Sequence, residues 1–595
     1  MPARRAPFPT GLGAQFVRHA PRYLIGFFLL AAYHSAQYWF DTTLWRAINL
    51  ALGGRHDHAI SLGVGMVAVV MFAFVVRVAS RVVMFNAGRK AEYELRTELQ
   101  EHLMRLGPSF YRRMSTGDIM SRATNDLVQV RLLLGFGVLN VFSTGLALVS
   151  ALAIMRQVSV PLTLAALCPL PLLLFASRRL SREMFVRTRD TQAALGDMSG
   201  RVQTSIAGVR VIRSFALEEQ ELVAFERTNQ AYLEKSLSLA RLRGSLGPVL
   251  QFALSAGLLV AFWYGGSLMI DGVIDAGGFL AFTRALSRLA WPLISLGFVL
   301  GLVQRGRAAY QRLGEVYRAE PDIADGPLPA PLAVAGRLEV RHLSFAYGEH
   351  DVLAGVSFAL EPGRSLAIVG RTGSGKSTLA VLLARLQPTP PHSVFLDGAD
   401  VCDLPLATLR GAIGYAQQNA FLFSTTAARN IGFPLDDPDS PENRARIEAA
   451  AREAGVHAEL SALPDGFDTV VGERGVQLSG GQKQRVALAM AFVSNPRILI
   501  LDDPLSAVDA RTERRILEAI DRQRAERSVL LVTHRVAAAS RCDHIVVLDR
   551  GRIVEQGRHD ELVRNGGLYA VFAEEQRVES ELERLGHDPS EAAVA

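Results

Sequence analysis

The chain has 595 residues, 49% of them hydrophobic and 21% charged, and its mean hydropathy is +0.19. This length suggests about three or four structural units and excludes one ordinary domain, while the hydropathy is high for a wholly soluble protein. The net charge of +6 and the pI near 9.3 would suit nucleic-acid binding, but basic loops beside membrane helices explain them more simply, so we expect no nucleic-acid partner.

Six apolar segments follow an arginine-rich N-terminal segment, 1–22, which is expected to approach the membrane surface. Each is long enough to cross about 30 Å of hydrocarbon as a helix. They are Tyr23–Phe40, Ile60–Phe85, Leu132–Met155, Val158–Ala176, Leu246–Ile270 and Gly277–Val303. A cleaved signal peptide is not expected, because its apolar stretch would be shorter and five further spans follow. The sequence therefore predicts an all-α transmembrane domain of six helices over residues 23–305.

Two of the loops between these segments are long, helix-favouring and rich in arginine: Gly88–Arg131 and Ser177–Arg243. The positive-inside rule places both long loops and both chain termini in the cytoplasm. A helical arm of twenty residues reaches roughly 30 Å past the membrane. Each loop has a break at its tip, at Ser115–Asp118 and at Ala207–Gly208. We therefore expect two cytoplasmic arms suited to transmit motion to a second domain.

Two arginines, Arg284 and Arg288, are four residues apart in the sixth apolar segment and share one helical face. Charges at membrane depth are costly and usually face a cavity or a charged partner. Two interpretations have equal weight. The pair forms a substrate cavity that binds anionic groups, or it is a structural pair with a carboxylate of another subunit.

A soluble α/β domain is predicted over residues 336–575, after a Pro- and Gly-containing linker, 306–335, and before a charged tail, 576–595. A strand at Ser365–Val369 leads directly into a Gly-rich loop that opens a helix, which is the context a phosphate-binding loop requires. The loop residues are Gly370, Arg371, Thr372, Gly373, Ser374, Gly375, Lys376, Ser377 and Thr378. Their backbone N–H groups and the positive end of the helix favour phosphate.

Within this loop, Lys376 is expected to reach the β- and γ-phosphates of the nucleotide, and Ser377 to place its hydroxyl on Mg²⁺. A second Mg²⁺ ligand is predicted at Asp502, because a buried apolar strand delivers this carboxylate to its C-terminal end. A second anion-binding surface is predicted where small residues open a helix. That segment comprises Leu478, Ser479, Gly480, Gly481 and Gln482.

The order of these motifs resembles that of ATP-binding cassette (ABC) exporters. Along the chain come Tyr347 in SFAY, the phosphate loop, Gln418 in AQQNAFLF, the LSGGQ signature, Asp502, the SAVD loop and His534 in VTHR. The SAVD loop comprises Ser506, Ala507, Val508 and Asp509. The resemblance implies a multi-domain fold, with an all-α six-helix transmembrane domain followed by an α/β P-loop nucleotide-binding domain. It also implies ATP and Mg²⁺ as cofactors.

The resemblance assigns roles to individual residues. Tyr347 would stack on adenine, a contact that contributes about 1–3 kcal/mol per base. Gln418 would sense Mg²⁺ and the γ-phosphate, and His534 would contact the γ-phosphate. In the family, two such domains clamp ATP head to tail, so Ser479 and Gly481 would close over nucleotide held by a different subunit. One copy of each motif therefore implies a dimer of half-transporters.

One residue departs from the family pattern: Asp503 stands where the family has a Glu that orients the attacking water. Its side chain is shorter by about 1.5 Å, and a misplacement of around 1 Å can cost about a hundredfold in rate. The chain thus resembles the degenerate-site subunit of heterodimeric bacterial multidrug and lipid exporters, with a site that binds ATP but hydrolyses it slowly. The alternative is a homodimer in which Asp503 is a working catalytic carboxylate.

The expected function is ATP-driven export of a hydrophobic or amphipathic substrate, such as a drug, lipid or peptide. The expected location is the plasma (inner) membrane, where the multi-pass chain also contacts membrane lipid. An ATP-gated channel or a membrane regulator is a less favoured alternative, because no obvious regulatory insertion is present. An importer is also disfavoured, since importers usually resemble separate membrane and ATPase chains.

Overall fold

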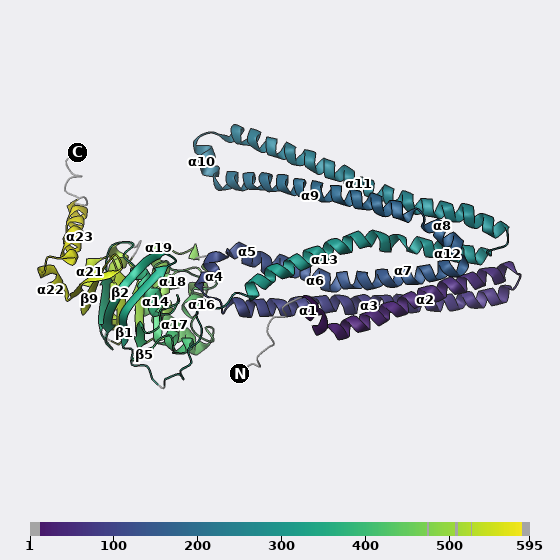
Figure 1. Cartoon of the computed structure of the whole chain (residues 1–595). Coiled ribbons are helices and arrows are strands. Elements are labelled where there is room, and N and C mark those ends of the chain that lie inside the picture. The colour runs from purple at the N-terminus through teal and green to yellow at the C-terminus, as the bar shows by residue number, and fades with distance from the viewer. Residues whose placement is uncertain (1–11, 332, 473–474, 506–509, 525, 586–595) are drawn as a thin grey trace. The chain divides into compact units, whose positions relative to one another are not determined.

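The computed structural model describes residues 12–331, 333–472, 475–505, 510–524 and 526–585. It divides into two compact units. The first unit extends to Arg105 and resumes at Met114–Ala319; the second comprises Leu106–Arg113 and the chain from Glu320 onward. The first unit is helical and the second contains both sheets, as Figure 1 shows. This order, a helical domain followed by an α/β domain, is the one that the sequence predicts.

Long helices dominate the first unit, and α9 and α11 lie side by side, joined through the short α10 (Figure 1). Two π-helical turns, η1 and η2, interrupt the otherwise α-helical segment from α5 to α7. The helices are α1 (Leu12–Arg18), α2 (Ala20–Leu52), α3 (His56–Leu103), α5 (Thr116–Ser121), η1 (Arg122–Asp126), α6 (Leu127–Leu132), η2 (Leu133–Gly137), α7 (Val138–Val158), α8 (Val160–Leu167), α9 (Leu170–Ala207), α10 (Val209–Ser214), α11 (Glu218–Ile270), α12 (Ala276–Arg288) and α13 (Ala290–Tyr317).

The predicted apolar segments lie in these helices, but the helices are longer or divided. By length and composition, two helical stretches of the described chain could each cross a membrane: α3 and the continuous Thr116–Val158. A shorter apolar stretch, Ser255–Ile270, ends α11. The fourth predicted span is divided between α8 and α9, and the sixth is divided between α12 and α13 at Leu289.

Two predicted boundaries fall inside helices. The predicted linker, 306–335, begins within α13, which continues to Tyr317, and the two units divide between Ala319 and Glu320. The predicted start of the C-terminal tail, residue 576, lies in the middle of the helix Leu568–Leu585. Loss of hydrophobicity marked both predicted boundaries, but a surface helix continues through polar residues as long as one face stays packed.

The second unit is built on two sheets, with strand orders β2-β1-β4-β5 and β10-β9-β3-β8-β7-β6. In the larger sheet β9, β3, β8, β7 and β6 run parallel to their neighbours, and β10 is antiparallel to β9. The strands are β1 (Leu338–Tyr347), β2 (His350–Leu360), β3 (Ser365–Val369), β4 (Val394–Leu396), β5 (Ala399–Asp400), β6 (Ile413–Ala416), β7 (Ile498–Asp502), β8 (Ser528–Thr533), β9 (His544–Asp549) and β10 (Arg552–Gly557).

Helices accompany both sheets of the second unit. They are α4 (Pro108–Arg113), α14 (Lys376–Leu383), α15 (Leu406–Ala412), α16 (Ala427–Ile431), α17 (Pro441–Glu453), α18 (His457–Ser461), the 3₁₀ turn η3 (Gly466–Asp468), α19 (Gly480–Phe492), α20 (Ala510–Arg524), α21 (Val536–Ala539), α22 (His559–Arg564) and α23 (Leu568–Leu585).

The central parallel strands β3, β7 and β8 are buried along their whole length. Successive side chains of a strand point to opposite faces of the sheet. In β7, Leu499 and Leu501 pack into one hydrophobic core, while Ile498 and Ile500 pack into another. Burial on both faces explains why these strands are continuous apolar runs in the sequence. The parallel pairing also places the carboxyl ends of all three strands at one edge, where ligands bind in open α/β sheets.

Candidate functional site

A cavity of about 360 Å³ lies at this edge of the larger sheet, and residues from five predicted motifs line it. The lining residues that the sequence singles out are Tyr347, Thr372, Gly373, Gly375, Lys376, Ser377, Thr378, Gln418, Asp502, Asp503 and His534. Val352 and Val532 also line it, and they carry no polar signal that sequence reasoning could detect. The structure thus brings together segments that lie up to 187 positions apart, from Tyr347 to His534.

The phosphate loop follows β3 and its backbone requires glycine. Gly375 has a φ of +99°, and a Cβ atom there would lie 2.9 Å from the carbonyl oxygen of Val352. Lys376 Nζ donates hydrogen bonds of 2.8 Å to the carbonyl oxygens of Gly370 and Arg371. Burial lowers the pKa of Lys376, and the negative charges of Asp503 and Asp502 oppose this effect. The loop therefore holds an ammonium group beside the start of α14.

Asp502 ends β7, and its buried carboxylate is hydrogen-bonded on both oxygens. Oδ1 accepts from the Ser377 hydroxyl at 3.0 Å, and Oδ2 accepts from the Tyr415 hydroxyl at 3.4 Å. Burial raises the pKa of Asp502, and these two hydrogen bonds oppose the increase. Tyr415 is a site neighbour that the sequence did not indicate, because a tyrosine within a strand is ordinarily a packing residue.

These oxygen groups fit a magnesium ion. A carboxylate, a hydroxyl and an amide carbonyl are hard donors of the kind that Mg²⁺ prefers. Asp502 and Ser377 are already within 3.0 Å of each other, and Gln418 lines the same cavity. Burial raises the pKa of Asp502. A cation bound by these donors would favour the ionised form of its carboxylate.

Asp503 lies immediately beyond β7 with a φ of +46°, a left-handed conformation that Asp tolerates better than most residues. Its backbone N–H donates to the carbonyl oxygen of Val532 at 2.8 Å. Its Oδ2 is 3.3 Å from Nδ1 of His534, which follows β8. The structure therefore brings together the two residues to which the resemblance assigns hydrolytic roles.

Tyr347 ends β1 at the rim of the cavity. Its ring lies 5.3 Å from the guanidinium of Arg112 in α4, and the Phe345 ring packs edge-on against it at 4.9 Å. Arg112 also donates to Gln387 at 3.2 Å. The tyrosine is thus held by two neighbours in the same unit, and a nearby cation on an aromatic ring is stabilising.

The signature segment does not line this cavity in the described chain; it caps α19. Ser479 Oγ accepts from the backbone N–H of Gln482 at 3.3 Å, and Gln482 Oε1 accepts from the N–H of Ser479 at 2.9 Å. Leu478 is buried, whereas Ser479 and Gly480 are exposed. This reciprocal capping box presents the N-terminus of a helix to solvent. The SAVD loop, Ser506–Asp509, lies outside the described residues.

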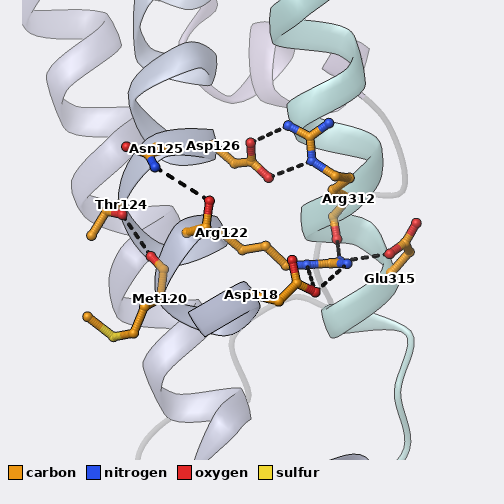
Figure 2. Close-up of polar contacts among 9 residues, drawn as sticks. Asp118, Met120, Arg122, Thr124, Asn125, Asp126, Arg312 and Glu315 are labelled. Atoms are coloured by element: carbon orange, nitrogen blue, oxygen red, sulfur yellow. Dashed lines mark hydrogen bonds and ion pairs between the residues drawn. The ribbon is translucent and has the colours of Figure 1, made fainter. Parts of the chain in front are cut away.

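In the first unit, the arm Gly88–Arg131 is joined to the end of α13 by ion pairs, as Figure 2 shows. Asp126 accepts from Arg312 Nε at 2.9 Å and makes a second bond to the same guanidinium. Arg122 pairs with Glu315 at 2.7 Å and also with Asp118. Asp126 and Arg122 are buried, whereas the side chains of their partners Arg312 and Glu315 are half exposed. The arm and the last helix of this unit are therefore firmly linked.

Arg284 and Arg288 both bind Asp41 of α2. Arg284 Nε donates to Asp41 Oδ1 at 2.7 Å, and Arg288 pairs with Oδ2. Asp41 is fully buried, and the Arg284 guanidinium lies 4.3 Å from the ring of Phe40. This arrangement favours the structural interpretation over the substrate cavity, although the carboxylate belongs to the same chain and not to another subunit. The predicted first span ended at Phe40, whereas α2 continues to Leu52 and places Asp41 against Arg284 and Arg288 of α12.

Comparisons with known proteins agree with this architecture. A family model described as "ABC transporter transmembrane region" matches residues 23–293, and one described as "ABC transporter" matches residues 353–506. The chain is 36% identical to a probable multidrug resistance ABC transporter ATP-binding/permease protein, YheI, of Bacillus subtilis, over 83% of this chain and 84% of that one. It is 37% identical to an ATP-dependent lipid A-core flippase of Aromatoleum aromaticum, over 80% and 79%.

A solved structure of a bacterial Atm1-family ABC exporter with ATP bound is similar along almost the whole chain. The TM-score is 0.72 at 26% sequence identity, and the match covers 94% of this chain and 98% of that one. The predicted fold class, a helical transmembrane domain followed by an α/β nucleotide-binding domain, is therefore confirmed.

Proposed function

Because this chain belongs to the ABC exporters, membrane proteins that couple ATP hydrolysis to transport, we propose that it is one half of a dimeric exporter whose other half is a second half-transporter. The observation that supports a dimer is the separation of the two ATP-binding motifs. The phosphate loop lines the cavity, whereas Ser479 is exposed at the N-terminus of α19 outside the cavity lining. A second protomer would bring its own signature to the nucleotide.

In this proposal ATP is bound between two protomers, and the residues of the cavity have distinct tasks. Lys376 binds the β- and γ-phosphates, Tyr347 stacks on adenine and His534 contacts the γ-phosphate. Ser377, Gln418 and Asp502 would hold Mg²⁺, which neutralises phosphate charge when bound. Asp503 orients the attacking water. The hydroxyl–carboxylate contact at 3.0 Å and the Asp503–His534 contact at 3.3 Å support these assignments.

Closure of the two ATP-binding domains would then be passed to the membrane helices through the cytoplasmic arms. The ion pairs of Arg122 and Asp126 with the end of α13 support this role, because they link the first arm to the last membrane helix. Hydrolysis would reset the transporter. The substrates are hydrophobic or amphipathic, in agreement with the multidrug and lipid exporters that the chain resembles.

We place the transporter in the plasma (inner) membrane with both termini in the cytoplasm. The arginine-rich arms support this orientation through the positive-inside rule. Protease treatment of inside-out vesicles checks it: a C-terminal tag should be removed, and a tag that survives intact until detergent is added would contradict the orientation.

We favour a heterodimer in which this chain carries the weakened hydrolytic site. Purification in mild detergent through a tag on this chain tests the composition directly. A second, different half-transporter in equal amount supports the heterodimer. Recovery of this chain alone, in two copies, supports the homodimer with Asp503 as a working catalytic carboxylate.

Asp503→Glu is expected to speed single-turnover ATP hydrolysis at this chain's own site by about ten- to a hundredfold, because the longer side chain restores the reach to the attacking water. The measurement is hydrolysis of radiolabelled ATP by the purified complex, in which this site contributes the slow phase. Asp436→Glu is the matched control, since Asp436 is exposed in the same unit and lies outside the residues that line the cavity. An unchanged slow phase in Asp503→Glu would refute the weakened-site proposal.

A further inference from the structure

The C-terminal helix α23 contacts two segments that form the ATP site. The guanidinium of Arg371, in the phosphate loop, lies 5.7 Å from the ring of Phe572 and 3.8 Å from Glu575. One residue further along, Gln576 reaches the segment that carries His534. The sequence placed residue 576 in a charged tail outside the ATP-binding domain, so this contact was not foreseen.

The side-chain amide of Gln576 holds the backbone on both sides of Arg535. Its Nε2 donates to the carbonyl oxygen of His534 at 2.7 Å, and its Oε1 accepts from the N–H of Val536 at 2.8 Å. A glutamine side chain has both a donor and an acceptor, so a single amide fixes the two peptide groups that flank Arg535. The direction in which His534 leaves the backbone is thereby set from α23.

Two further contacts restrain the same short segment. The N–H of Arg535 donates to the hydroxyl of Thr533 at 3.0 Å, and Thr533 is fully buried at the end of β8. The Arg535 guanidinium pairs with Glu513 of α20. The imidazole of His534, by contrast, is half exposed. Beside the contact of this ring with Asp503 at 3.3 Å, its direction depends on how the backbone is held.

We propose that Gln576 is a positioning residue for ATP hydrolysis, which keeps His534 directed at the γ-phosphate. This inference rests on the proposed role of His534. The C-terminal helix is then a working part of the ATP site, because it supports the phosphate loop through Arg371 and the histidine through Gln576.

The test is single-turnover hydrolysis of radiolabelled ATP by the purified complex. In a heterodimer the slow phase reports the rate at this chain's own site, and in a homodimer the single phase reports it. Gln576→Met has similar length and shape but cannot make either hydrogen bond. We expect it to slow hydrolysis about tenfold, since small misplacements of a reacting group are costly. ATP affinity should stay unchanged. Gln556→Met, at an exposed position of β10, is the matched control.

A double-mutant cycle separates positioning from a general structural effect. In a His534→Ala background, Gln576→Met should cause no further loss, because both changes remove the same contact. A further tenfold loss in that background would overturn the inference, as would an unchanged rate in Gln576→Met when His534→Ala is slow. If His534→Ala itself leaves the rate unchanged, the proposed role of His534 fails and the inference fails with it.

Discussion

Inside-out vesicles that contain the Lys376→Ala variant are expected to lose ATP-driven uptake of a fluorescent amphiphile down to the background level. The ammonium of Lys376 is held inside the phosphate loop by two backbone carbonyls, where it would meet the β- and γ-phosphates. Without this charge the phosphate loop would bind ATP poorly, so the two ATP-binding domains would not close and the partner's site would not hydrolyse ATP either. The loss should appear in ATP hydrolysis as well as in uptake.

Lys235→Ala is the matched control for this variant. Lys235 is exposed on α11 and lies outside the residues that line the nucleotide cavity, so its removal should leave both activities unchanged. The same vesicles also distinguish a pump from a channel. Uptake that persists in Lys376→Ala, or a passive conductance that ATP only gates, would contradict the exporter proposal and favour the channel.

Ser479→Arg is expected to lower the steady-state rate of ATP hydrolysis by the complex about a hundredfold or more. The arginine side chain would block a surface that stabilises phosphate charge. The expected defect is selective. Ser479 is outside the cavity lining of its own unit, so ATP binding at this chain's phosphate loop should be retained. The two measurements are the steady-state hydrolysis rate and the affinity for a labelled, non-hydrolysable ATP analogue.

Loss of a helix cap alone destabilises a protein by about 0.5–2 kcal/mol, and a control must separate this effect. Ser440 caps α17 in the same way, with its hydroxyl accepting from the N–H of Asn443 at 3.3 Å. Ser440→Arg should therefore lower the melting temperature about as much as Ser479→Arg, yet leave hydrolysis intact. Equal losses of hydrolysis in both variants would show that destabilisation, and not the signature surface, explains the result.

The parts of the site that the sequence predicted are those whose chemistry is local. A strand, a Gly-rich loop and a helix follow one another from Ser365 to Leu383, and a second apolar strand ends in Asp502. Parallel pairing of β3, β7 and β8 then brings their ends together. The burial of Asp502 and its contact with Ser377 thus follow from motifs that are visible in the chain.

Residues that act through long-range contacts were missed. Tyr415 bonds Asp502 from a neighbouring strand, and Gln576 bonds the backbone beside His534 from a helix near the end of the chain. Neither residue belongs to a recognisable motif. Their partners are set by the packing of whole elements, which no short window of sequence contains.

Helix boundaries in the first unit failed for a related reason. Hydropathy ended the first span at Phe40, because Asp41 is unfavourable in hydrocarbon when considered alone. In the folded chain Arg284 and Arg288 neutralise this carboxylate, so α2 continues past it. A charge that is paired only in the tertiary structure looks like the end of a span in the sequence.

The most direct test of the dimeric ATP site is to measure hydrolysis as a function of the number of protomers. Nanodiscs can be separated into those that hold one half-transporter and those that hold two. We expect discs with one copy of this chain to bind ATP but not to hydrolyse it, and discs with two half-transporters to hydrolyse it. Full-rate hydrolysis in discs with a single protomer would contradict the account.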